Sequence, residues 1–213
     1  MVTERKRYSV ADLVSSGQLF IGDGYRAKNA ELGSSGIPFA RITNINDGFH
    51  FEGADRFPVE NLARVGNKIS QVGDVVFTSK GSVGRLAYVD AKTPQFVYSP
   101  QLCYWRALDP NVINSRFLFY WMQGNEFIAQ YCSVMGQTDM ANYVSLADQR
   151  KMHITIPSPK EQNEIVGILG VIDDKIAVNK NSNSILEAIA RALFKSWFID
   201  FDPVHAKAEG RDP

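Results

Sequence analysis

The sequence contains only two cysteines and three histidines among its 213 residues, and none of these five lies at the spacing of metal ligands. Cys103 and Cys132 do not form a C-x-x-C pair, and His50, His153 and His205 have no cysteine or histidine close to them in the sequence. This scarcity argues against a structural zinc site, which needs four grouped ligands. It favours two buried free thiols in a reducing cytoplasm.

The sequence also lacks a long hydrophobic run and a net charge. No apolar stretch approaches the roughly 20 residues that span a membrane, and the N-terminus MVTERKRYSV has no apolar core of a secretory signal. We therefore expect a cytoplasmic protein without a membrane partner. Lys and Arg number 17 against 14 Asp and Glu in residues 1–160, and 6 against 9 in residues 161–213. The first part, at +3, is the better candidate to meet a polyanion, although so small a charge does not indicate DNA binding by itself.

Motifs of the common catalytic sites are missing as well. There is no G-x-S-x-G, no H-E-x-x-H, no Walker loop and no glycine-rich dinucleotide loop. Asp74 and Lys80 resemble a fragment of a metal-dependent nuclease core, but the second carboxylate of such a core is absent at a useful spacing. We predict that the chain is not an enzyme and has no metal site.

What the sequence does contain is a heptad-like pattern in its last quarter. Alternate steps of four and three residues give the seam Ile165, Leu169, Ile172, Ile176, Asn179, Asn183, Leu186, Ala190, Leu193 and Trp197. A spacing of 3.5 keeps one seam of a helix facing a partner helix, and Asn within the seam fixes register and partner. Pro157 and Pro159 mark the start, and a helix over most of this stretch would be roughly 55 Å long. This length favours a projecting arm over the alternative, an amphipathic helix packed on its own domain.

The front part of the chain predicts an α+β domain, because short strands follow one another without a βαβ rhythm. The predicted strands are Ile37–Ile42, Phe49–Phe51, Val72–Thr78, Arg85–Val89, Phe96–Tyr98, Leu102–Arg106 and His153–Pro157. Asn114 is predicted to cap a helix that runs to Ile128. We therefore expect a strand-rich domain at 1–157, a long coiled-coil-forming helix at 158–201, and a tail or linker at 202–213.

Three loops of the front domain carry side chains suited to DNA. The candidate residues are Arg41, Asn44 and Asn46 after one strand, Lys80, Ser82 and Arg85 between two strands, and Gln137 and Thr138 after a helix. Arg and Lys can bind phosphates or guanine edges, and Asn pairs with adenine through two hydrogen bonds. Each loop also has a plainer interpretation, as a turn former, a hairpin with solvated charges, or an ordinary helix exit.

Several motifs together resemble the specificity subunit of type I restriction–modification systems. They are GDVVFTSKGSVGRLAYV, the helix FLFYWMQGNEFIAQY, the helix entry IPSPKEQ and the exit LFKSWFIDFDP. The resemblance runs over nearly the whole chain, and the entry and exit of the long helix carry it most strongly. It implies a target-recognition domain that reads one half of a split DNA site, and a helix that acts as spacer.

The resemblance also implies partners. The helix would dock methyltransferase (modification) subunits, and through that complex a restriction subunit that translocates and cuts DNA. It implies no cofactor for this chain, because the methyl donor and ATP belong to the partners. A complete subunit of this family has two recognition domains and two helices, so the chain is expected to be a natural half-subunit or a piece of a longer one.

The seam and the resemblance lead to the same expectation, an antiparallel homodimer through the long helix. A two-fold axis would then relate two recognition domains, and half-sites roughly 34–36 Å apart would fall on one face of the duplex. Two other classes of function stay open at this point. One is a coiled-coil adaptor whose front domain binds protein rather than DNA, and the other is an enzyme with an unrecognised site.

Overall fold

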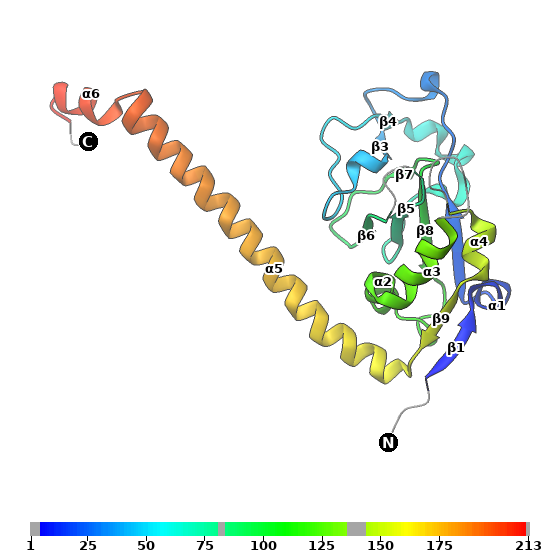
Figure 1. Cartoon of the computed structure of the whole chain (residues 1–213). Helices are drawn as coiled ribbons and strands as arrows, with labels where there is room; N and C mark the ends of the chain where they lie inside the picture. Colours follow the sequence, from blue (N-terminus) through cyan, green and yellow to red (C-terminus); the bar gives the residue numbers. More distant parts are fainter. Residues whose placement is uncertain (1–4, 81–83, 136–143, 212–213) are drawn as a thin grey trace. The chain divides into compact units, whose positions relative to one another are not determined.

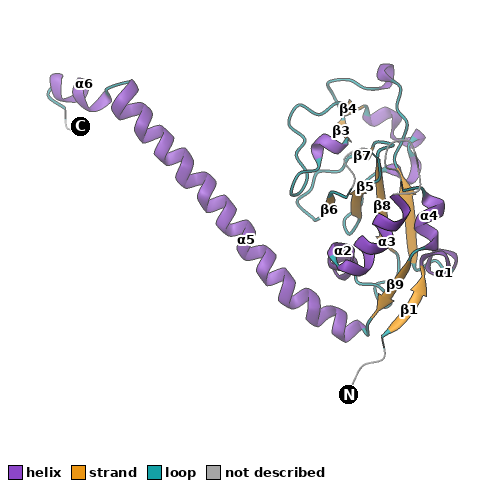
Figure 2. Ribbon diagram, viewed as in Figure 1, coloured by secondary structure: helices purple, strands orange, loops and turns teal. Residues whose placement is uncertain are grey.

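The computed structural model describes residues 5–80, 84–135 and 144–211 (Figure 1). The chain divides into two compact units, Met1–Val166 and Gly167–Pro213. The first unit combines three small sheets with short helices and the start of the long helix, which continues into the second unit (Figure 2). The predicted α+β class is therefore confirmed, whereas the predicted domain boundaries stay a prediction.

The strands and helices are short except for one. The strands are β1 (Lys6–Ser9), β2 (Leu19–Asp23), β3 (Ile37–Ala40), β4 (Arg56–Phe57), β5 (Val75–Thr78), β6 (Leu86–Tyr88), β7 (Val97–Tyr98), β8 (Leu102–Ala107) and β9 (His153–Ile156). The α-helices are α1 (Val10–Ser15), α2 (Ser115–Gln123), α3 (Asn125–Met135), α4 (Leu146–Lys151), α5 (Pro159–Phe194) and α6 (Asp202–Ala208).

The central sheet has four antiparallel strands in the order β2-β8-β5-β6. Successive side chains of a strand point to opposite faces, so Val75 and Phe77 of β5 join one core cluster while Val76 joins another. In the first cluster α2 and α3 pack on the sheet, and the Phe127 ring lies edge-on against both Phe77 and Trp105. This helix-covered face forms the larger core of the first unit.

The opposite face packs against a second sheet in the order β4-β3-β7, in which β3 and β7 run parallel. Tyr98 of β7 stacks on Tyr104 of β8 with ring centroids 4.3 Å apart. The strand predicted at Phe49–Phe51 is wrong, because this segment is a loop whose two phenylalanine rings both pack on Phe96. The apolar alternation that predicted a strand therefore serves ring packing instead of strand pairing.

Two other expectations need correction. The helix predicted from Asn114 to Ile128 is divided into α2 and α3 at Gly124, although Asn114 does cap α2 by accepting from the backbone N–H groups of Arg116 and Phe117. Cys103 is buried as predicted, but Cys132 on α3 is exposed. Whether a cysteine on a surface helix is buried depends on which face of the helix points inward. The sequence pattern predicts that face only approximately.

Helix α5 is 36 residues long, or about 54 Å at 1.5 Å per residue. A π-helical turn follows it at Lys195–Ile199, and α6 begins after Phe201. Phe201 has a left-handed backbone with a φ of 54°, which is rare for a bulky side chain. The segment predicted as a tail or linker from residue 202 is therefore helical over α6.

Candidate nucleic-acid interface

Two of the three predicted DNA-binding loops adjoin and are joined by Arg85. Its Nη1 donates to the carbonyl oxygens of Ile42 and Ile45 at 3.5 and 3.0 Å, and these belong to the loop after β3. Its backbone N–H donates to Thr78 Oγ1 at 3.0 Å, at the end of β5. Arg85 is still exposed, so its positive charge lies at the junction of the two loops.

Asn44 stabilises the loop after β3 from within. Its side chain is 8% exposed. Oδ1 accepts from the Arg41 backbone N–H at 2.8 Å, and Nδ2 donates to the His50 carbonyl oxygen at 2.9 Å. The amide that the sequence suggests for adenine is therefore engaged within the loop. Asn46 is exposed beside it, and its carbonyl oxygen lies 2.9 Å from His50 Nε2.

A pocket of about 270 Å³ opens beside this loop. Its lining residues are Arg41, Thr43, Asn44, His50, Glu52, Gly53, Ala54 and Asp55. Arg41 Nη2 donates to Asp55 Oδ2 at 2.7 Å in an ion pair whose two side chains are 45% and 51% exposed. Cation, amide and carboxylate groups therefore share one open surface, and these are the groups that contact phosphates and base edges.

Lys80 is a second exposed cation, besides Arg85, in the connection between β5 and β6. Three other predicted contacts, Ser82, Gln137 and Thr138, lie outside the described residues. The structure thus brings Arg41, Asn46, Lys80 and Arg85 to two adjoining loops. Sequence reasoning missed His50 and Asp55. Asn44 holds the His50 backbone within the loop, and the antiparallel pairing of β3 with β4 brings Asp55 beside Arg41.

Asp74, which with Lys80 resembled a nuclease fragment, is buried in a structural ion pair. Its two carboxylate oxygens accept from Arg106 Nε and Nη2 at 2.6 and 2.8 Å, and Tyr98 Oη donates to Oδ2 at 2.6 Å. Burial raises the pKa of Tyr98 well above its ordinary value, and the neighbouring Asp74 charge and hydrogen bond raise it further. The carboxylate is fully committed to this cluster, whereas Lys80 is exposed.

The IPSPKEQ segment contains Gln162, which is only 1% exposed although it is polar. Its Nε2 donates to the carbonyl oxygens of Val112 and Pro157 at 2.9 and 3.0 Å, and its Oε1 accepts from the Asn114 N–H at 2.8 Å. A buried amide with every contact made is costly to replace. Gln162 therefore anchors the first turns of α5 to the first unit.

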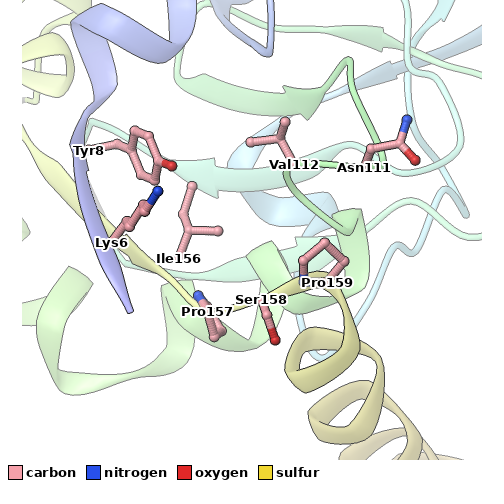
Figure 3. A pocket seen from close by; sticks show the side chains of 8 residues that line it. All are labelled: Lys6, Tyr8, Asn111, Val112, Ile156, Pro157, Ser158 and Pro159. Atoms are coloured by element: carbon pink, nitrogen blue, oxygen red, sulfur yellow. The ribbon is translucent and has the colours of Figure 1, made fainter. Parts of the chain in front are cut away.

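A second pocket of about 270 Å³ lies at this helix start (Figure 3). It is lined by Lys6, Tyr8, Asn111, Val112, Ile156, Pro157, Ser158 and Pro159, and we call it the root pocket. Carbon atoms of Val112, Ile156 and the prolines make an apolar lining, and Lys6 supplies a positive charge. Sequence reasoning missed this pocket because three separate segments build it.

The predicted seam of α5 is exposed along most of its length. Six of its apolar side chains are exposed, with Trp197 at 58%, and the other five are Leu169, Ile172, Ile176, Leu186 and Leu193. The heptad seam did not predict a second exposed row on this helix. This second row consists of Ile168, Val171, Val178, Ile185 and Ile189, each at least 50% exposed. At 100° per residue this row lies about 100° around the helix axis from the seam. Exposed apolar rows of this extent are typical of surfaces that bind other helices.

Other kinds of site find no support in the part of the chain that the structure describes. No three His, Cys, Asp or Glu side chains there are grouped so that they could hold a metal ion. No helix among the described residues combines the length and the apolar character needed to cross a membrane.

The sequence matches the family model described as type I restriction modification DNA specificity domain over residues 11–188. It is 31% identical over 156 residues to the HindI specificity subunit of Haemophilus influenzae, covering 71% of this chain and 33% of that protein. It is 29% identical over 136 residues to the MjaIX specificity subunit of Methanocaldococcus jannaschii, covering 64% and 30%. The chain thus spans about a third of the length of these relatives.

Solved structures with a similar fold come from the same kind of protein. The S subunit of a type I restriction–modification system from M. genitalium has a TM-score of 0.63 at 15% identity, covering 98% of this chain and 50% of that one. The HsdS subunit from Thermoanaerobacter tengcongensis has a TM-score of 0.57 at 17% identity, covering 93% and 46%.

Proposed function

The chain belongs to the family of type I restriction modification DNA specificity domains, and on this premise we propose that it recognises one half of a two-part DNA site. The observation that carries the proposal is the extent of the family match, residues 11–188, which includes both adjoining loops and most of α5. One recognition unit followed by one long helix is what half of a two-part reader requires.

The DNA surface of this proposal consists of the loop after β3 and the connection between β5 and β6. Lys80, Arg41 and Asn46 are exposed there and would contact phosphates or bases. Arg85 and Asn44 keep the two loops in position through the hydrogen bonds described above. Ser82, Gln137 and Thr138 remain predicted contacts. Releasing Arg41 from its exposed pair with Asp55 would cost little, because such pairs contribute about 0–1 kcal/mol.

Dimerisation through α5 is the second part of the proposal. The seam is symmetric about Asn181, so that an antiparallel copy sets Asn179 beside Asn183 and Ile165 beside Trp197. Apolar positions then meet apolar positions, and the two polar layers meet each other. A helix of about 54 Å is long enough to hold two half-sites 34–36 Å apart on one face of the duplex.

Docking of modification subunits is the third part. If the seam is covered by a second copy, the row from Ile168 to Ile189 is left for another helix. We assign this row to the methyltransferase subunits, which would bring the methyl donor and the reaction, and through them to the restriction subunit. The chain itself would then do no chemistry, and Asp74 is committed to Arg106 in agreement with this division.

Fluorescence anisotropy with a labelled mixed-sequence duplex tests the DNA proposal against a protein-binding adaptor. For a DNA-binding chain, the logarithm of the association constant falls linearly with the logarithm of the salt concentration, because bound cations release counterions. An adaptor would leave the anisotropy unchanged at every salt concentration. That result, with the chain folded and dimeric, would remove the DNA-reading role and keep the helix.

A further inference from the structure

The aromatic end of the second unit has features that helix pairing alone does not explain. Phe198, Phe201 and Val204 are 62%, 51% and 61% exposed. Phe201 is also held in a left-handed backbone conformation, and strain of this kind is found where a side chain is presented for a function. The acidic residues Asp200 and Asp202 flank it in the sequence. Asp200 is paired with Lys195 Nζ at 3.0 Å, whereas Asp202 accepts from the Ser196 hydroxyl at 2.7 Å. Helix α6 therefore begins with an exposed aromatic ring next to the Asp202 carboxylate.

The root pocket has the complementary chemistry. Its lining is apolar at Val112, Ile156 and the prolines, and Lys6 stands at it as an exposed cation (Figure 3). Lys160, in the first turn of α5, is 88% exposed and reaches Glu164 only at 3.9 Å. In the same turn Glu161 is paired with Arg5, so the cation of the pocket lining is Lys6. An apolar pocket with one cation in its lining fits an aromatic side chain next to a carboxylate.

The symmetry of the seam brings these two surfaces to the same height. Pairing about Asn181 sets Trp197 of one copy beside Ile165 of the other. The residues that follow Trp197 are then level with the first turn of the second copy's α5, where Pro157 and Pro159 line the root pocket.

We propose that Phe201 of one copy inserts into the root pocket of a second copy, and that Asp202 pairs with Lys6 there. This inference rests on the proposed antiparallel dimer. The contact occurs twice in the dimer, once at each end. Because the root pocket belongs to the recognition unit, the two contacts would fix the direction in which each recognition unit faces and thus the spacing of the two half-sites.

Sedimentation equilibrium of the full chain tests the proposal, with the dimer dissociation constant as the readout. Phe201→Ala should raise this constant about thirtyfold, as expected for an aromatic anchor in a pocket. Lys6→Glu and Asp202→Lys should each raise it several-fold, and the double variant should restore most of the loss, because the charges are exchanged. Arg7→Glu is the matched control: Arg7 is an exposed neighbour on β1 that does not line the pocket, so its effect should be small.

The outcomes separate this inference from its premise. A wild-type chain that stays monomeric at tens of micromolar would overturn the dimer and this contact together. A wild-type dimer whose affinity is unchanged by Phe201→Ala would overturn the contact alone. The same holds if Lys6→Glu acts no differently from Arg7→Glu, or if the double variant shows no recovery.

Discussion

At the scale of single residues, Asn44 and Arg85 hold the two adjoining loops in position, and Lys80 is exposed on one of them. Arg41, Asn44, Lys80 and Arg85 were all plausible for DNA, and all four belong to the two adjoining loops. The structure separates them, because Asn44 turns inward to close its loop and Arg85 ties the loops together. The contacts of Arg85 join residues 43 and 40 positions apart in the sequence, and no local pattern encodes them. The inward turn of Asn44 is local instead, because its partners lie three and six positions away.

The two cations of the β5–β6 connection should therefore behave differently when removed. Lys80→Ala should lower DNA affinity similarly for all sequences and reduce the magnitude of the salt slope by about 1, since it removes one phosphate contact. Arg85→Ala should lower affinity and also loosen the loop after β3, because two carbonyl oxygens lose their donor. Anisotropy titrations at several salt concentrations, with hydrogen exchange of residues 41–50, measure both effects.

Lys207→Ala on α6 is the matched control, as it removes one exposed lysine far along the sequence from the loops. Unchanged DNA binding for both Lys80→Ala and Arg85→Ala in the complex with modification subunits would reject this surface. Equal hydrogen exchange in the Lys80 and Arg85 variants would reject the positioning role of Arg85.

At the scale of elements, the long helix was the most predictable part of the chain. Its heptad spacing and the prolines before it are local signals, and α5 begins at Pro159 as expected. Strands β1 and β2 escaped prediction because each is defined by a partner far along the chain, β9 and β8 respectively. The second apolar row escaped because Lys175 and Ser182 interrupt it at its own heptad positions, which weakens its periodic signal.

Substitutions in the seam and in the second row should affect dimerisation and subunit docking separately. Replacing Ile172 and Ile176 together with Asp puts four charges into the interface of an antiparallel pair, and we expect monomers by light scattering at tens of micromolar. A buried unpaired charge costs several kcal/mol, which is enough to dissociate a dimer of this size. The measurement is the molar mass of the isolated chain.

Replacing Ile185 and Ile189 with Asp is the matched control on the second row. This variant should remain dimeric and lose affinity for the modification subunits. If the second-row variant were monomeric and the seam variant dimeric, the assignment of the two surfaces would be reversed. If both stayed dimeric, α5 would not be the dimer interface.

At the scale of the whole molecule, the proposed function assigns DNA recognition to this chain and most of the binding strength to the modification subunits. Residues 1–160 carry an excess of only three positive charges, 17 against 14, and phosphate neutralisation sets most of the affinity of a DNA-binding protein. The free chain should therefore bind DNA weakly. Modification subunits docked on the second row of α5 would close around the duplex and supply most of the phosphate contacts.

The most direct test of the central claim is methylation mapping with and without the modification subunits and the methyl donor. The account predicts that DNA affinity rises steeply when the subunits are added, and that methylation appears only then. The modified positions should form two symmetric half-sites about one helical turn apart. The account would be contradicted if the isolated chain bound a specific site at nanomolar strength in physiological salt, or if it methylated DNA unaided.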